Sequence, residues 1–247
     1  MSGQASWRGP VLMVVGLFVL WQALYWIVGE VALRSPLDTI RHTAALFARP
    51  SFWPHVVESA RAFAAAIVIA VVLGMAVGLA LGFGRLAGQV FEPMLVALYS
   101  VPKVTLYPIL LLTFGLGISA KIAFGALHGF IPIALFTINA VRNVRPILIK
   151  TGRVLNFDTR ELVWRILIPA ALPEIFSGIR IGLSLTLIGT LLGEMFASQR
   201  GLGYMLMNAI GLHNVDVIMS ITFVLVVFAA VVSSLLLAVD RRLHRRA

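Results

Sequence analysis

Long apolar runs, separated by short segments that carry most of the charges, dominate the pattern along this chain. Residues 9–29 and 62–84 contain no charged residue. Each is long enough to cross a bilayer, which takes about 20 apolar residues in helical form. Four further runs have the length and apolar character of spans: about 94–116, 122–141, 173–196 and 217–239. The pattern therefore predicts an all-α, polytopic membrane protein with six transmembrane helices.

The segments between the spans do not mark a second domain. We expect one transmembrane domain over residues 1–247, with the first span within about 9–33 and a five-helix core at 59–240. Residues 34–58 mix charged, apolar and proline positions, which predicts one or two short helices at the outer membrane interface. A basic tail at 241–247 is expected at the inner surface.

Composition supports a membrane protein and excludes several classes of function. The chain is 60% hydrophobic and 12% charged, whereas soluble domains carry about 25% charged residues. Cysteine is absent from the sequence, so disulfides and thiolate metal sites are excluded. A formal net charge of +10 is compatible with nucleic-acid binding, but the basic residues lie in the connections between apolar runs. The bilayer is therefore the expected partner, and nucleic acid is not.

The distribution of basic residues predicts the orientation. Six spans place both termini on one side, and that side receives twelve Lys and Arg residues, six of them between Arg142 and Arg165. The opposite side receives about five, among them Arg200. Because cytoplasmic loops are enriched in Lys and Arg, we expect both termini and the segment 150–173 in the cytoplasm.

Three glycines predict a close helix contact. Gly74, Gly78 and Gly82 recur every four residues in the second span, so they share one helix face. In lipid such a face permits close backbone approach to another helix. The alternative is a set of scattered membrane glycines with no common partner.

The third span is expected to bend and to line the solute path. Pro102 and Pro108 each remove a backbone donor, and Lys103 places a charge among apolar residues. Because unsatisfied backbone is costly in hydrocarbon, the bend should face protein or a water-filled cavity. Tyr99, Lys103 and Thr105 are therefore candidates for the path, unless Lys103 extends to an interface instead.

The fifth span and the segment after it supply further candidates. Pro173 fits the first helical position of this span, Arg180 is expected near its cytoplasmic end, and Glu194 lies near its other end. Glu194 either lines the path or is paired structurally, and the structural role is favoured. Residues 197–216 are expected to form an outer loop that serves as a gate or receptor contact.

A charged, amphipathic segment at 150–173 separates the fourth and fifth spans. Asp158 is a good N-cap and Glu161 stands three residues later, as in a capping box. Phe157 and Leu162 occupy the positions of a hydrophobic staple. A short helix should therefore begin at Thr159.

That short helix should end at Pro169, and a second one should precede it. Residues 147–155 predict the upstream helix, and Asn156 its end, because Asn tolerates the left-handed conformation. The result is a helix-turn-helix at the membrane surface. It is either a connecting loop or a docking element for another protein, and spacing alone favours the connecting loop.

This segment resembles the EAA loop of ABC importer permeases, the cytoplasmic element that contacts the ATPase subunit. The family pattern is Glu-Ala-Ala, three residues, Gly, nine residues, then Ile-x-Leu-Pro. Anchored on Ile166 and Pro169, the chain has Ile168 for the Leu, Asn156 for the Gly, and Lys150-Thr151-Gly152 for Glu-Ala-Ala. The second half fits well and the first half poorly, and Lys for Glu reverses a charge.

Three further stretches resemble the subfamily that serves nitrate, sulfonate, taurine and similar solutes: VPKVTLYPILLLTFGLGISAKIA from Val101, IPAALP from Ile168 and GEMFASQRGLGYMLMNA from Gly193. The resemblance implies a type I ABC importer permease in a bacterial inner membrane. It also implies a second permease copy, most simply in a homodimer, together with ATPase subunits and an external solute-binding protein. If Lys103 lines the path, the small organic solute is expected to be anionic. The residues expected to couple to the ATPase, within a loop at 146–169, are Arg153, Asn156, Phe157, Asp158, Glu161, Leu162 and Arg165.

The sequence contains none of the common catalytic motifs. No G-x-x-x-x-G-K-[ST] is present, and no cluster has the spacing of metal ligands, so the chain should bind no cofactor and ATP and Mg²⁺ should reside in the ATPase. We therefore expect a transport subunit and not an enzyme. The alternative is an ion-coupled transporter or channel that acts alone. It is disfavoured because Glu194 is the only acidic residue in the interior of a predicted span, and it lies near an end.

Overall fold

The computed structural model describes residues 8–196 and 198–244, and this part of the chain is built from helices joined by turns. The α-helices are α1 Arg8–Val28, α2 Pro36–Phe47, α3 Trp53–Phe83, α4 Arg85–Ser100, α5 Tyr107–Phe114, α6 Ile118–Arg142, α7 Pro146–Val154, α8 Thr159–Leu162, α9 Ile168–Phe196, α10 Leu202–Gly211 and α11 Val215–His244. A 3₁₀ turn, Lys103–Leu106, precedes α5, and a π turn, Val163–Leu167, joins α8 to α9.

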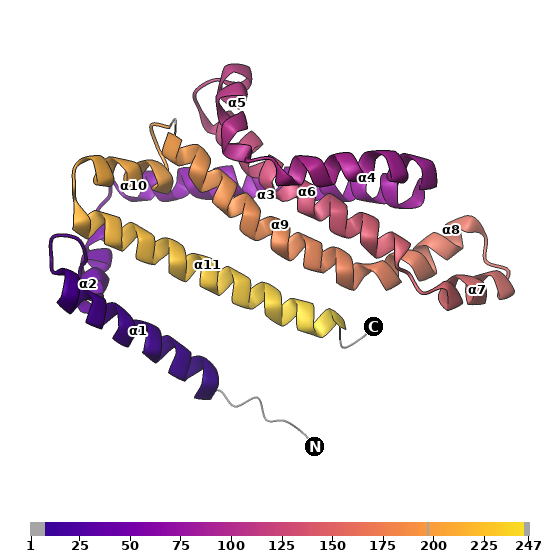
Figure 1. Cartoon of the computed structure of the whole chain (residues 1–247), viewed down its shortest axis with the longest axis horizontal. Coiled ribbons are helices and arrows are strands. Elements are labelled where there is room, and N and C mark those ends of the chain that lie inside the picture. Colours follow the sequence, from indigo (N-terminus) through magenta and orange to yellow (C-terminus); the bar gives the residue numbers. More distant parts are fainter. Residues whose placement is uncertain (1–7, 197, 245–247) are drawn as a thin grey trace.

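Five of the described helices are long and apolar enough to cross a membrane, and α4 with α5 forms a bent pair that supplies a sixth. The all-α, six-span prediction is therefore confirmed when the bent pair is counted as one span. Figure 1 shows an elongated molecule in which α2 and α10 lie at one end and α7 and α8 at the other. The first described residues of α1 and the last of α11 point away from the end that holds α2 and α10.

The centre of the fold is formed by α3, α6 and α9, which make the most extensive contacts with one another. The glycines predicted to permit close approach lie where α3 meets α6. A Cβ at Gly74 would lie 2.8 Å from Ile133 Cβ, one at Gly82 would lie 2.9 Å from Val141 Cβ, and one at Gly78 would overlap Thr137. The shared glycine face therefore brings the two helices together, as the four-residue spacing predicts.

The outer helices leave their apolar surfaces exposed. Most of the large apolar side chains of α1 are exposed, and on α11 Val226, Val231 and Leu235 are more than half exposed. Trp21 of α1 contacts Phe223 of α11, with ring centroids 6.2 Å apart. Such apolar exposure is expected of spans that face lipid or another subunit.

The third span is not one helix over 94–116. It breaks after Ser100, and α4 and the segment Lys103–Phe114 meet at an angle of 94°. Pro102 lies at the break, because proline supplies no backbone donor and favours extended backbone in the residue before it, here Val101 with ψ of 133°. The sequence predicted a bend but not one of this size.

The fifth span begins earlier than predicted. Pro169 does not end a helix, and Pro173 does not begin one. The helix α9 runs through both prolines and is continuous with α8. In the π turn the N–H of Ile168 donates to Val163 O, one residue further back than in an α-helix. This wider turn gives room for the ring of Pro169, which would otherwise crowd the carbonyl four residues earlier.

Three smaller boundaries also differ from the sequence-based expectation. The outer segment 34–58 contains one short helix, α2, within the one or two expected, but its last residues already belong to α3. Residues 197–216 are not a simple loop, since they contain α10, which packs on α9 and α11. The helix α11 continues to His244, so much of the tail 241–247 is helical, and residues 245–247 lie outside the described part.

Candidate functional site

The segment 146–169, hereafter the elbow, projects from the end of the molecule opposite α2 and α10 (Figure 1). It consists of α7, a tight turn, α8 and the π turn that leads into α9. The elbow therefore connects α6 to α9, two of the three helices at the centre of the fold.

The end of α7 is fixed by its own backbone. Asn156 has φ of +54°, the left-handed conformation predicted for it. The N–H of Phe157 donates to Gly152 O and that of Asn156 to Arg153 O, both at 3.0 Å. This pair of bonds is a Schellman motif, which satisfies carbonyls that the helix end would leave without partners. Asn thus performs here the turn that the family pattern assigns to Gly.

A capping box begins α8. The N–H of Glu161 donates to Asp158 Oδ1 at 2.6 Å, and the N–H of Asp158 donates to Glu161 Oε2 at 3.4 Å. The helix starts at Thr159, so the predicted cap and start are confirmed. Caps of this type stabilise a helix by about 1 kcal/mol. Local bonds therefore hold both arms of the elbow at its turn.

The two arms pack around a glycine that sequence reasoning did not select. Gly152 is buried, and a Cβ there would lie 2.5 Å from Leu162 Cδ1, 2.7 Å from Ile166 Cδ1 and 3.6 Å from Phe157 Cδ2. Leu162 and Phe157, the predicted staple residues, thus converge on one point of α7. The sequence could have pointed to Gly152, because it stands in the Glu-Ala-Ala part of the family pattern, where small residues occur.

The outer surface of the elbow combines charges with exposed apolar side chains. Arg165 Nη2 lies 3.2 Å from Glu161 Oε1, and the Arg165 guanidinium lies 5.4 Å from the centre of the Phe157 ring. Val154 and Trp164 are 80% and 65% exposed. Trp164 was not among the predicted coupling residues. Large apolar side chains exposed beside charges are typical of a protein-binding surface.

The predicted path residues Tyr99, Lys103 and Thr105 gather at the break between α4 and α5. Lys103 Nζ donates to Tyr99 O at 3.0 Å and lies 4.7 Å from the centre of the Tyr99 ring. Thr105 Oγ1 donates to Pro102 O at 2.7 Å. The Tyr99 side chain is 41% exposed. The structure therefore places these three residues together at a broken point of a span.

Glu194 occupies a different environment. It is fully buried and accepts hydrogen bonds from the Ser59 hydroxyl, at 2.8 and 2.7 Å to its two oxygens, and from Gly203 N at 2.9 Å. Ser59 in turn accepts from Leu202 N at 2.8 Å. Glu194 therefore links α3, α9 and α10 through hydrogen bonds. These contacts are those expected if the carboxylate has a structural role.

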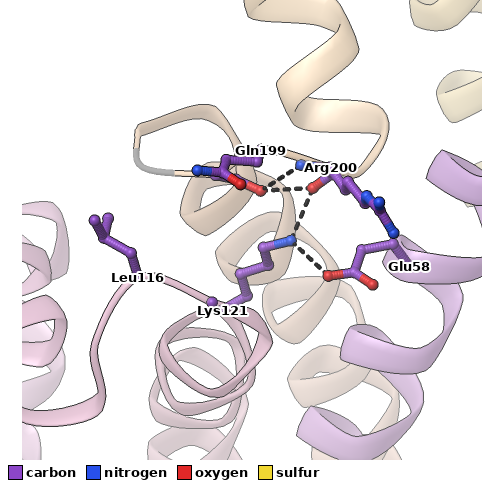
Figure 2. Close-up of a pocket in the computed structure, with 7 residues that line it drawn as sticks. Glu58, Leu116, Lys121, Gln199 and Arg200 are labelled. Carbon is purple, nitrogen blue, oxygen red and sulfur yellow. Dashed lines mark hydrogen bonds and ion pairs between the residues drawn. The ribbon is translucent and has the colours of Figure 1, made fainter.

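A pocket of about 410 Å³ opens beside this cluster and is shown in Figure 2. Lys121 of α6 is 2% exposed, and its Nζ lies 3.0 Å from Glu58 Oε1 and 2.8 Å from Arg200 O. Ser198 Oγ donates to the same carbonyl at 2.5 Å. Lys121 thus joins α3, α6 and the turn before α10. Sequence reasoning missed this role because Glu58 lies 63 residues away.

Among the described residues, no group of His, Cys, Asp or Glu side chains is arranged to hold a metal ion. His128 contacts Phe124 O through Nδ1 at 2.8 Å within the buried face of α6, as expected of a packing residue. The elbow is therefore the element with the clearest features of a functional surface.

Residues 70–247 match the family model described as the inner membrane component of binding-protein-dependent transport systems. This chain belongs to that family. It is an ABC importer permease, the main interpretation of the sequence, and the match does not favour the ion-coupled alternative.

Curated relatives agree along nearly the whole permease. The chain is 28% identical to the taurine transport system permease protein TauC of Escherichia coli (strain K12), over 98% of this chain and 94% of that protein. It is 35% identical to the riboflavin transport system permease protein RibX of Chloroflexus aurantiacus, over 85% and 78% of the two chains. It is 27% identical to SsuC of Bacillus subtilis (strain 168), named as a putative aliphatic sulfonates permease, over 83% and 75%.

Solved structures agree with the permease fold. The methionine ABC transporter MetNI in inward-facing conformations matches with a TM-score of 0.68 at 20% identity, over 79% of this chain and 98% of that chain. An amino acid ABC transporter solved with histidines matches with a TM-score of 0.64 at 15% identity, over 83% and 97%. At these identities the likeness confirms the type I importer fold alone.

Proposed function

We propose that this permease carries a small, anionic organic solute across the bacterial inner membrane. It works as a homodimer, receives the solute from an external binding protein, and is driven by ATPase subunits that seat on the elbow. ATP and Mg²⁺ are bound by the ATPase, and both permease termini lie in the cytoplasm.

The elbow carries this proposal. Its two arms are held by a Schellman motif, a capping box and apolar packing around Gly152, so it can move as a rigid unit. Its second arm continues through the π turn into α9 without a loop. A push on the elbow would therefore be transmitted along α9 to the centre of the fold.

The distribution of charge supports the orientation. The elbow contains Lys150, Arg153, Arg160 and Arg165, and the C-terminal tail adds four arginines. Positive residues are enriched on the cytoplasmic side of membrane proteins. The same orientation is required for contact with an ATPase that uses cytoplasmic ATP.

The solute class rests on the names of relatives and on the break in the third span. Two of the relatives above are named for taurine and aliphatic sulfonates, which are organic anions or zwitterions with a sulfonate group. At the break, Lys103 provides a cation beside the exposed ring of Tyr99. The relative named for riboflavin shows that related permeases serve other organic solutes, so the anionic class is the narrower part of the proposal.

The homodimer is supported by exposed apolar surface. On α4, Val90, Phe91 and Met94 are each about half exposed or more. A second copy of the chain would cover such surface and enclose the path between the two permeases.

The test uses the pair of substitutions Leu162→Asp and Phe157→Ala. Leu162→Asp places a charge between the two arms, and Phe157→Ala removes the ring that packs near Gly152. We expect both co-purification of the ATPase and ATP-driven solute uptake to fall together. Leu212→Asp, at the opposite end of the molecule and 70% exposed, is the control for co-purification. Normal co-purification and uptake by the paired variant would contradict the proposal.

A further inference from the structure

An arginine near the middle of α9 lines a groove that no sequence motif pointed to. Arg180 lies 12 residues after Ile168, about 18 Å along the helix axis, and only two residues from the midpoint of α9. The sequence-based expectation placed it near the cytoplasmic end, because the span was taken to begin at Pro173. Because α9 begins at Ile168, Arg180 lies near the middle of this helix.

The groove has a volume of about 440 Å³ and polar groups from three helices. Its lining residues are Tyr99, Arg180, Ile181, Ser184, Leu185, Ser233, Ser234 and Leu237. Arg180 and Ser184 are one turn apart on α9, where Ser184 Oγ donates to Arg180 O at 3.3 Å. Ser233 and Ser234 lie on α11, and Tyr99 lies at the end of α4.

The polar groups of the groove belong to segments with the length and apolar character of membrane spans. Arg180 and Ser233 lie within two of these long apolar helices, and Tyr99 lies in the first half of the bent pair formed by α4 and α5. A cation and three hydroxyls from serines within such spans are costly in lipid, so they are expected to face protein or water.

The groove also adjoins the broken point of the third span. Tyr99 precedes the break at Val101 and Pro102, where the chain turns by 94°. Backbone without helical hydrogen bonds is tolerated within a span only against protein or an aqueous cavity. The mid-span arginine and the helix break are independent observations, and both point to the same groove.

We propose that Arg180 is the anion-binding residue of the solute path. Its guanidinium binds the sulfonate or carboxylate head of the solute, and the hydroxyls of Ser233 and Ser234 donate further hydrogen bonds. A planar guanidinium forms paired hydrogen bonds with such oxyanions more readily than an ammonium group does. This inference rests on the proposed function, since it assigns the site for the solute class named there.

The rest of the lining defines the remainder of the ligand. Ile181, Leu185 and Leu237 supply apolar surface beside the polar groups, and Tyr99 adds an aromatic face. The groove therefore fits a compact organic anion with a short apolar body, and a bare inorganic anion would leave this surface unfilled. Lys103 does not line the groove, but its ammonium lies 4.7 Å from the centre of the Tyr99 ring and so places a second cation near it.

The absence of cysteine from the chain allows a test that does not require the solute to be known. Ser184→Cys is introduced into the full permease, assembled with its ATPase in membrane vesicles. It is treated with the anionic thiol reagent 2-sulfonatoethyl methanethiosulfonate or with a cationic reagent of the same type that carries trimethylammonium. The ratio of the two labelling rates, each divided by the rate with free thiol, measures anion preference at the groove.

We expect the anionic reagent to be preferred at Ser184→Cys by roughly 10-fold or more, because a cleft of one charge concentrates the opposite ion. Arg180→Gln in the same background should remove the preference, and Arg180→Lys should retain part of it. Ser51→Cys, in an exposed turn between α2 and α3, is the matched control, and its ratio should not respond to Arg180→Gln. Equal rates of both reagents whether or not Arg180 is present, or no labelling by either, would overturn the proposal.

Transport measurements distinguish a failure of the proposed Arg180 site from a failure of the proposed importer function. Uptake of labelled taurine and of butanesulfonate is measured with the assembled importer and its binding protein in proteoliposomes. Arg180→Gln should lower ATP-driven uptake at least 10-fold with normal ATPase co-purification, whereas Arg41→Gln, on the exposed surface of α2, should not. Uptake that is unchanged in Arg180→Gln would overturn the site but leave the importer function intact. No uptake of either solute by the unmodified importer would contradict the proposed solute class, while the labelling ratio still decides whether Arg180 attracts anions.

Discussion

Asp158 and Glu161 each accept a hydrogen bond from the other's backbone N–H, at 2.6 Å to Asp158 Oδ1 and 3.4 Å to Glu161 Oε2. This reciprocal pair fixes the start of α8 against the turn at Asn156. It makes the elbow a defined structure and not a loose connection between α6 and α9. The importance of the elbow for coupling can therefore be tested through this cap.

Asp158→Ala should weaken the elbow while leaving all its other surface side chains in place. Loss of such a cap costs about 1 kcal/mol. We expect reduced stimulation of ATP hydrolysis by the loaded binding protein, with normal amounts of permease in the membrane. Asp158→Ser, which can cap the same helix, should restore stimulation. Equal stimulation in the alanine and serine variants would show that the cap has no part in coupling.

The glycine face of α3 predicts a strong dependence on side-chain size. A Cβ at Gly78 overlaps Thr137, so Gly78→Leu should force α3 and α6 apart and cost about 3 kcal/mol. Gly16 on α1 has no atom within 4 Å of the corresponding position, which makes Gly16→Leu a matched control. The apparent thermal midpoint in detergent should fall for Gly78→Leu only. A similar midpoint for both variants would argue against close packing of these helices.

The sequence predicts features that depend on a few adjacent residues. The left-handed Asn156, the cap at Asp158 and the glycine spacing of α3 were all visible because each depends on local backbone geometry or on helical period. The turn in the third span was visible for the same reason, since Pro102 cannot donate a backbone hydrogen bond.

Features that depend on distant residues were not predictable. The burial of Lys121 requires Glu58 and the carbonyl of Arg200, which come from other parts of the chain. The helix α9 continues through Pro169 and Pro173 because of a π turn, and no simple sequence pattern predicts that turn. The place of Arg180 near the middle of α9 follows from that boundary.

The ion pair of Lys121 with Glu58 predicts an asymmetric response to mutation. Lys121 has a side chain only 2% exposed, whereas that of Glu58 is 24% exposed. Glu58→Ala leaves a buried ammonium without its carboxylate and should cost roughly 3–5 kcal/mol. Lys121→Met leaves a carboxylate that water can reach, so its cost should be smaller. Thermal unfolding of both single variants and the double variant measures this, and a larger loss for Lys121→Met would contradict the asymmetry.

The cluster around Glu194 predicts a structural and not a transport defect. Glu194 is fully buried with hydrogen bonds from Ser59 and Gly203. Glu194→Ala should leave these donors unsatisfied and lower the amount of folded permease, and Ser59→Ala should do so to a smaller degree. Glu30→Gln, in which the original side chain is 69% exposed, is the control. Folded Glu194→Ala permease in normal yield with a specific loss of uptake would instead place this carboxylate in the path.

Site-specific photocross-linking tests the central claim most directly. Because the chain has no cysteine, Val154→Cys in the elbow and Leu212→Cys at the opposite end can each be labelled with benzophenone maleimide. Both original side chains are at least 70% exposed. In assembled importer, illumination should join the ATPase subunit to the permease labelled at residue 154 and not to the one labelled at residue 212. An ATPase adduct from residue 212 alone, or none from residue 154, would contradict the account.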